Sequence, residues 1–142
     1  MALRLCAVAV VVLLALAVAG CEGALTLTGE RTTQSQGEHL GNVGGEVDVR
    51  IGSANGTGTR DIEFGYSDAV VEVEVTLQVQ EGSVTLEFLG EDDQVTLTLE
   101  ARGGEEVSGT GTMVTDAFGE GEYRITANKA RGVAYHISYW IR

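Results

Sequence analysis

The sequence predicts an all-β domain, an antiparallel β-sandwich of seven to eight short strands, with a small β-barrel as the second possibility. Three observations support this prediction. Apolar and polar residues alternate with a period of two through most of residues 46–142. Turn-forming segments recur about every ten residues, and no helical periodicity appears in this region. Clean alternation gives each strand one buried and one wet face, which is typical of antiparallel sheets.

Length and composition limit the classes of protein to consider. The chain has 142 residues, 20 glycines and no proline, which is enough for one domain. Its formal net charge is -12, and because phosphate binding needs a basic face, we expect no nucleic-acid partner. Two cysteines are too few for a disulfide-rich scaffold or a cysteine-based zinc site.

Residues 1–20 have the layout of an export signal peptide. Arg4 supplies a positive start, residues 5–18 are apolar throughout, and the small residues Ala19 and Gly20 follow. A permanent membrane-spanning helix needs ~20 apolar residues, which is more than this stretch provides. We therefore expect these residues to be removed and not to contribute to the fold.

The tetrapeptide Val18-Ala19-Gly20-Cys21 resembles the lipobox of bacterial lipoproteins. The resemblance implies that Cys21 receives a diacylglyceryl thioether, that the signal is cut before it, and that the new amino group is acylated, for example with palmitate. It further implies an exported protein, lipid-anchored to the bacterial cell membrane or the outer membrane. Two or more acyl chains anchor a protein stably, because each buried CH₂ contributes ~0.8 kcal/mol. The alternative is an ordinary secretory signal with a chance cysteine.

Residues 21–45 are expected to form the lipidated cysteine and a flexible tether. The segment is polar and rich in Gly, Thr, Gln and Glu, a composition typical of spacers. Residues 24–28 alternate in polarity and are expected to form one short strand. The sandwich domain is then expected over residues 46–142.

The first strands of the domain follow from the alternation. Two short apolar series are separated by an expected loop over residues 53–59: Val47, Val49 and Ile51, then Ile62, Phe64 and Tyr66. The strongest series comes next: Val71, Val73, Val75, Leu77 and Val79. Its polar partners point to the opposite face, so one face of this strand is expected to be buried.

A three-strand meander over residues 69–102 is the part of the fold that pairing specifies best. A hairpin loop at residues 81–82 and a turn at residues 90–93 are expected to join its strands. The facing residues would then be Val79 with Val84, Leu77 with Leu86, and Phe88 with Val95. Because every inward pair is apolar, this register is self-consistent.

The rest of the chain predicts the last strands. Residues 107–115 contain Gly109 and Gly111, which favour an edge, a bulge or a change of sheet. A loop is expected over residues 116–121 and a turn over residues 128–132. Inward positions are expected at Tyr123, Ile125 and Ala127, then at Val133, Tyr135, Ile137, Tyr139 and Ile141.

The sequence contains no recognisable catalytic constellation. Its two histidines, His39 and His136, lack metal-ligand spacing. It has no Gly-x-Ser-x-Gly motif and no lysine-bearing phosphate loop. The sequence therefore predicts a protein that is not an enzyme, with no cofactor and no bound metal.

One acidic turn supplies candidate calcium ligands, namely Glu91, Asp92 and Asp93. Calcium takes six to eight oxygen ligands, and loops often provide them. These residues lack the regular Asp-x-Asp-x-Asp spacing of a calcium motif. A solvated turn that aids solubility is therefore the preferred interpretation.

Trp140 is the residue that fits a plain wet strand least well. It alternates with Tyr139 and Ile141, so it shares a face with His136. On a wet face, Trp140 and His136 are candidate contacts for a sugar ring or a protein partner. The preferred alternative is a strand covered on both faces, since a large aromatic side chain usually buries most of its area.

Three functional hypotheses follow from these features. The first is a lipid-anchored, non-enzymatic accessory or interaction domain of the cell envelope. The alternative is a carbohydrate-binding β-sandwich module, with or without calcium. The third is an envelope hydrolase that uses acidic residues. The expected partners are the membrane, through the lipid anchor, and an envelope protein or glycan.

Overall fold

The computed structural model describes residues 23–142, and the expected signal peptide and Cys21 lie outside the described residues. The described chain forms seven β-strands and one 3-10 turn. In chain order these are β1 (Thr26–Thr28), β2 (Arg31–His39), β3 (Asn42–Glu63), β4 (Val70–Leu89), η1 (Glu91–Asp93), β5 (Val95–Arg102), β6 (Glu105–Val114) and β7 (Glu120–Ile141). Within residues 23–142, no helix is long and apolar enough to cross a membrane.

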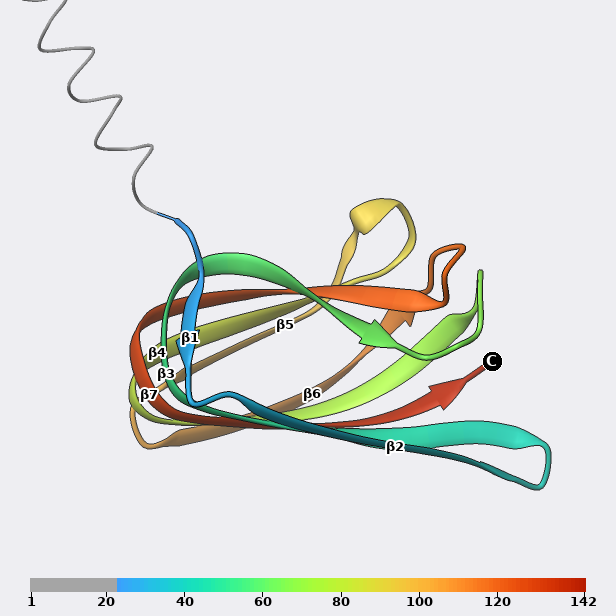
Figure 1. Cartoon of the computed structure of the whole chain (residues 1–142), viewed down its shortest axis with the longest axis horizontal. Coiled ribbons are helices and arrows are strands. Elements are labelled where there is room, and N and C mark those ends of the chain that lie inside the picture. The colour runs from blue at the N-terminus through green and yellow to red at the C-terminus, as the bar shows by residue number, and fades with distance from the viewer. Residues whose placement is uncertain (1–22) are drawn as a thin grey trace, which may run out of the picture.

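All seven strands belong to one antiparallel sheet, and three long strands form its centre. β3 and β7 have 22 residues each and β4 has 20, and β7 pairs with both of the others along most of its length. Each long strand bends in the middle, so the sheet folds over on itself as a sandwich (Figure 1). Register shifts mark these bends between Ala54 and Gly56 in β3 and between Glu81 and Ser83 in β4.

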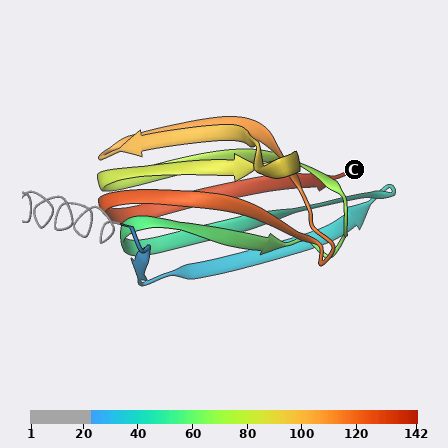
Figure 2. The same ribbon diagram turned by 90° about the horizontal axis from the view of Figure 1, so that it is seen from above.

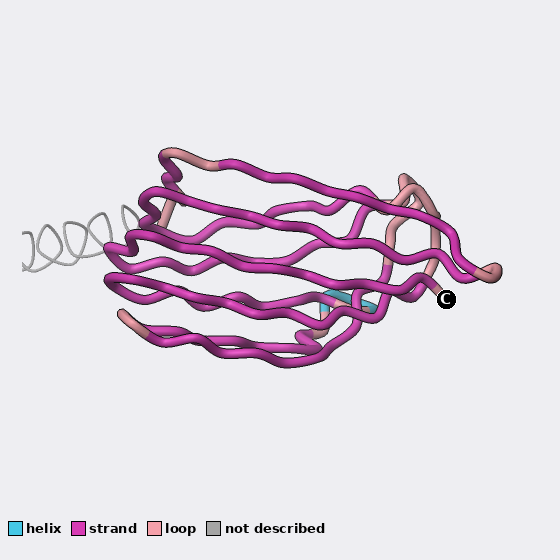
Figure 3. Tube along the Cα trace, turned by 90° about the horizontal axis from the view of Figure 1, so that it is seen from below, coloured by secondary structure: helices cyan, strands magenta, loops and turns pink. Residues whose placement is uncertain are grey.

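The two halves of the long strands form the centres of two layers. In the β2–β6 layer, β2 pairs with the first half of β3 and β6 with the first half of β4. In the β1–β5 layer, β1 and β5 pair with the second halves of the same strands. The strands run side by side along the molecule (Figure 2), and most loops gather at the end that holds the C-terminus (Figure 3). This architecture confirms the predicted all-β antiparallel sandwich, although three strands are longer than expected.

The hydrophobic core lies between the layers and consists mostly of residues whose alternation marked them as inward. Tyr66 and Val95, which were also expected to face inward, are 43% and 45% exposed, so these two expectations are wrong. The strongest predicted series is fully buried in β4: Val71, Val73, Val75, Leu77 and Val79. Aromatic rings fill the space across from it, and Phe88 stacks on Tyr123 with ring centroids 5.4 Å apart. β-Branched and aromatic side chains fit such a half-buried pleated surface well, which favours strand over helix here.

Three segments expected to be loops or turns are bends inside continuous strands. They are residues 53–59 in β3, 81–82 in β4 and 128–132 in β7. Val84, expected to face the first half of its own strand, pairs instead with Ala127 of β7. A hairpin and a bend both preserve the period of two, so polarity alone cannot separate them. The predicted hairpins at residues 81–82 and 128–132 are therefore wrong.

The hairpin between β4 and β5 exists, but its register differs from the expected one. Phe88 pairs with Leu97, where the sequence predicted Val95. The turn at η1 and an irregularity after Phe88 shift the pairing by two residues. A shift of two residues leaves every side chain on the same face of the sheet, so the inward pairs stay apolar. The polarity pattern is therefore compatible with both registers and cannot distinguish them.

The segment expected to be a flexible tether is largely ordered in the sheet. The predicted short strand at residues 24–28 is confirmed by β1, but residues 31–39 form β2, which pairs with β3 from Arg31–Arg50 to His39–Asn42. All nine residues of β2 are exposed. A strand with two wet faces needs no apolar alternation, so its polar sequence resembles a spacer.

Candidate binding face

The outer face of the β2–β6 layer gathers polar side chains from neighbouring strands. Its positions alternate with core residues and form rows across β3, β7, β4 and β6. The first row is Gly44, Trp140, Glu72 and Thr112; the second is Glu46, Ser138, Glu74 and Thr110; the third is Asp48, His136, Thr76 and Ser108. We refer to these three rows as the Trp140 face.

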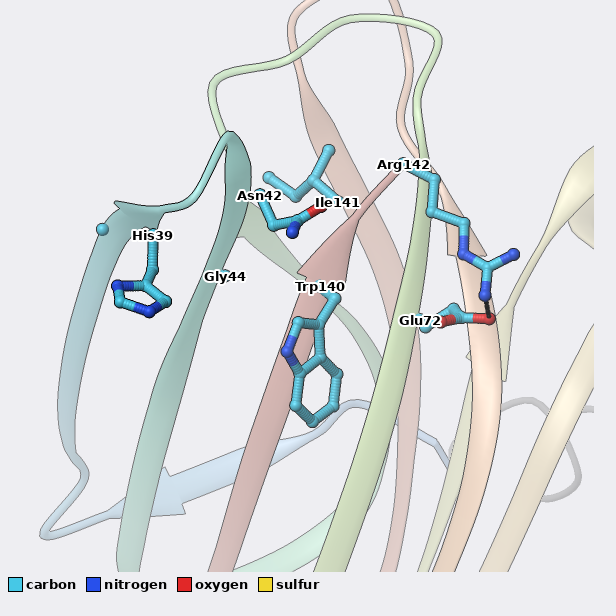
Figure 4. Close-up of a pocket in the computed structure, with 8 residues that line it drawn as sticks. His39, Asn42, Gly44, Glu72, Trp140, Ile141 and Arg142 are labelled. Carbon is cyan, nitrogen blue, oxygen red and sulfur yellow. Dashed lines mark ion pairs between the residues drawn. The ribbon is translucent and has the colours of Figure 1, made fainter.

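Trp140 is 48% exposed, so this side of β7 is open to solvent. The preferred expectation of a strand covered on both faces is therefore wrong. The indole lies beside Gly44 of β3 with its nitrogen toward that residue (Figure 4). A Cβ at Gly44 would be 3.3 Å from Cδ1 of Trp140 and 2.9 Å from the carbonyl oxygen of Tyr139. The absence of a side chain at Gly44 thus makes the room in which the indole lies.

Two open grooves flank Trp140. The groove over β2 and β3 has a volume of about 470 Å³, and its lining includes Gly37, His39, Asn42 and Gly44. The groove over β4 and β6 has a volume of about 360 Å³, and its lining includes Glu74, Thr110 and Thr112. Trp140 and Glu72 line both grooves, so the indole stands at the point where they meet.

An ion pair orients the carboxylate of Glu72, the cross-strand neighbour of Trp140. Nη2 of Arg142 lies 2.7 Å from Oε1 of Glu72, as the dashed line in Figure 4 shows. The backbone N–H of Arg142 donates to the carbonyl of Val70 at 2.9 Å, which holds this end of β7 against β4. The pair is largely exposed, so its role is to orient the carboxylate, and it adds little to stability.

His136 shares the face with Trp140 but contacts a different set of residues. Its Nδ1 lies 2.7 Å from Oδ1 of Asp48, and its Nε2 lies 3.2 Å from Oγ of Ser138. It lines a separate groove of about 180 Å³. The structure therefore places both predicted contact residues on one face, four residues apart along β7, but not in one groove.

The candidate calcium ligands are not brought together. Glu91, Asp92 and Asp93 occupy the exposed turn η1, in which Asp92 and Asp93 have positive φ angles. Within residues 23–142, no group of three or more His, Cys, Asp or Glu side chains is arranged to hold a metal ion.

Two buried tyrosines contact each other through their hydroxyl groups inside the described core. The hydroxyls of Tyr123 and Tyr135 lie 2.8 Å apart, and both side chains are 3% exposed. Burial raises the pKa of each phenol above its ordinary value. The pair joins the two layers inside the sandwich and does not reach the Trp140 face.

Sequence reasoning missed most residues that surround Trp140. Glu72 and Glu74 have the parity of a wet face, which by itself predicts only solvated charges. Their proximity to Trp140 depends on the pairing of β4 with β7, which joins segments far apart in the chain. Thr110 and Thr112 enter through a second long-range pairing, between β6 and β4. The local polarity pattern predicts neither the register between β4 and β7 nor that between β4 and β6.

No family model matches the chain, and no curated protein matches it. Among solved structures, one from Bacillus endospore appendages, described as disulfide-linked pili, is 12% identical with a TM-score of 0.45 over 82% of this chain and 91% of that chain. An oxalate oxidase is 18% identical with a TM-score of 0.42 over 81% of this chain and 52% of that chain. The Drosophila melanogaster CENP-C cupin domain is 14% identical with a TM-score of 0.30, over 74% and 73%. These similarities are too distant to indicate a ligand or an activity.

Proposed function

We propose that this chain is a non-enzymatic binding domain of the bacterial cell envelope, held at the membrane through a lipidated Cys21. The Trp140 face is its binding surface. The observation that carries the proposal is the half-exposed indole of Trp140 between two grooves.

An exposed tryptophan in this position favours a contact surface. Trp140 is the one tryptophan of the chain, and it lies in a face whose other side chains are mostly polar. A large apolar ring that stays in water leaves favourable burial energy unused until a partner covers it. Gly44 leaves room for the ring, and the Glu72–Arg142 pair orients the carboxylate beside it.

The experiment compares two exposed aromatic residues. Phe118 is 83% exposed in the loop before β7, is not one of the residues of the Trp140 face, and serves as the matched control. Full-length wild type, Trp140→Ala and Phe118→Ala are incubated in detergent with washed envelope material and sedimented. We expect wild type and Phe118→Ala to co-sediment and Trp140→Ala to remain in solution. Equal co-sedimentation of all three would contradict the proposal.

A second candidate function rests on one array of the same face. Ser138, His136 and Asp48 have the order of contacts found in a serine nucleophile, its base and an orienting carboxylate. The array stands on a strand that is paired on both sides, so neighbouring backbone N–H groups are used by the sheet and no oxyanion hole is evident among them. Labelling by a fluorophosphonate probe, lost in Ser138→Ala, would favour a hydrolase over a binding domain.

A further inference from the structure

We infer that the ligand of the Trp140 face is an amino-sugar polysaccharide, a chain of pyranose rings that carries protonated amino groups. The inference rests on the proposed function and names the chemical class of its ligand. It follows from the shape of the face, its single aromatic ring and its charge.

The two grooves form one track across the strands. The track consists of residues paired across successive strands, from Gly37 in β2 through Gly44, Trp140 and Glu72 to Thr112 in β6. Four strand spacings of about 4.8 Å make this track about 19 Å long. Gly37 and Gly44 have no side chains, so no side chain at these two positions fills the track. An extended chain of rings therefore has a continuous path past the indole.

The indole supplies the contact that a sugar ring needs. A pyranose has an apolar C–H face and a polar rim, and an amphipathic aromatic ring surrounded by polar groups matches both. The surrounding carboxylates accept hydrogen bonds, while the hydroxyls of Thr110 and Thr112 both donate and accept them. A nearby ammonium group gains a further attraction to the face of the indole.

The charge of the face selects among polysaccharides. Its three rows contain four carboxylates, on Glu46, Asp48, Glu72 and Glu74. Arg142 pairs with Glu72, and the imidazole of His136 lies 2.7 Å from Asp48 and 3.8 Å from Glu46, whereas no ion pair holds Glu74 within residues 23–142. Glu74 lines the groove beside Trp140 and is available to an ammonium group there. Uronate or phosphate polymers would be repelled by the same carboxylates.

A basic peptide would meet the same charges but fits the shape less well. Sheets recognise extended peptides at an open edge, through backbone hydrogen bonds. The track crosses β3, β7 and β4, whose backbone groups already pair with each other. A polysaccharide needs only side chains, so the track suits it better.

The test uses Trp140 as its own reporter. Because the chain has one tryptophan, its fluorescence reports on this face alone. The full chain in detergent micelles is titrated with a β-1,4-glucosamine hexamer, with its fully N-acetylated counterpart and with a galacturonate hexamer. We expect the glucosamine hexamer to change the fluorescence and to bind most tightly, the N-acetylated hexamer to bind more weakly, and galacturonate to leave the signal unchanged.

Variants locate the charge contribution. Glu74→Gln is expected to weaken binding of the glucosamine hexamer about two- to fivefold, the size of one exposed ion pair, and added salt should have the same effect. Glu100→Gln, on the exposed outer side of β5 in the other layer, is the matched control and should leave the affinity unchanged.

The outcomes separate the inference from the proposed function. Equal binding of neutral and amino hexamers without salt dependence would overturn the amino-sugar class. Binding of no saccharide, together with Trp140-dependent retention on envelope material, would overturn the inference in favour of a protein ligand and leave the binding face standing. Loss of that retention difference would overturn both.

Discussion

Single glycines shape the Trp140 face as much as its side chains do. Gly44 leaves the space beside the indole, and Gly37, its neighbour on β2, has nothing within 4 Å of where a Cβ would be. The two positions therefore differ in what an added methyl group would disturb. This difference gives a direct test of how the indole is held.

Gly44→Ala is expected to displace the indole, because the new Cβ would lie 3.3 Å from Cδ1 of Trp140 and 2.9 Å from the carbonyl oxygen of Tyr139. We predict a shifted Trp140 emission spectrum and weaker retention on envelope material. Gly37→Ala, the control for the position of the indole, should leave the emission spectrum unchanged, because nothing lies within 4 Å of its added Cβ. If Gly44→Ala matched wild type in both emission and retention, the role assigned to Gly44 would be wrong.

The Tyr123–Tyr135 pair is a second feature that depends on single residues. Tyr123→Phe leaves the buried hydroxyl of Tyr135 without its partner, which is expected to lower the free energy of unfolding by about 1–3 kcal/mol. Tyr66→Phe, at a 43% exposed side chain, should change it by less than about 0.5 kcal/mol. Urea denaturation of both variants measures the difference, and equal midpoints would contradict the expectation.

The same pair predicts how stability depends on alkaline pH. In the unfolded chain the phenols ionise near their ordinary pKa of 10.0, while burial raises the pKa of both in the folded protein. Above pH 10 the unfolded state therefore holds fewer protons than the folded state, and the free energy of unfolding falls as pH rises. Urea denaturation between pH 8 and pH 11 should show stability that is level at first and then declines. A flat profile would contradict this.

The sequence predicts on which face of its strand each side chain lies, but it does not predict which residues of other strands that side chain contacts. Alternation placed Trp140 and His136 on one face, and the structure agrees. The contact of His136 with Asp48 joins residues 88 positions apart, and it follows only from the pairing of β7 with β3. The exposure of Trp140 depends on whether another part of the chain covers the outer face of its layer. Local alternation of polarity carries no information on that.

At the scale of elements, the bends of the long strands decide the architecture. At the bend in β4, Gly82 has a φ of +77°, and a Cβ there would lie 2.3 Å from the carbonyl oxygen of Lys129. The bends of β4 and β7 are therefore nested against each other. A glycine is required at this position for both its conformation and its lack of a side chain.

Gly82→Ala is expected to destabilise the domain by about 2–5 kcal/mol, from backbone strain together with overpacking. Gly104 has a φ of +85° but open space around it, so Gly104→Ala isolates the strain and should lower stability by about 1–2 kcal/mol. Thermal or urea denaturation followed by circular dichroism measures both. Similar losses in the two variants would show that the bends are not closely nested.

The content of strand was predictable, whereas the connection between strands was not. Period-two alternation located most of β4 and parts of β3 and β7, because one face of each is buried. It gave no information on whether residues 81–82 turn the chain back or carry it into the other layer. It also missed β2, since a strand exposed on both faces has no apolar periodicity.

For the whole molecule, the lipid anchor remains a prediction from the lipobox resemblance. Cys21→Ser is expected to release the protein from membranes or to leave its signal uncut. The measurement is membrane fractionation combined with incorporation of labelled palmitate. Unchanged retention and labelling in the variant would exclude Cys21 as the attachment point.

The most direct test of the account is a map of where a ligand binds. Backbone amide resonances of the full chain in detergent micelles are recorded by NMR as the glucosamine hexamer is added. We predict shifts along the row of Gly44, Trp140, Glu72 and Thr112, with the outer side of the β1–β5 layer unaffected. Shifts confined to the β1–β5 layer or to the loops at the C-terminal end would contradict the assignment of the Trp140 face as the binding surface.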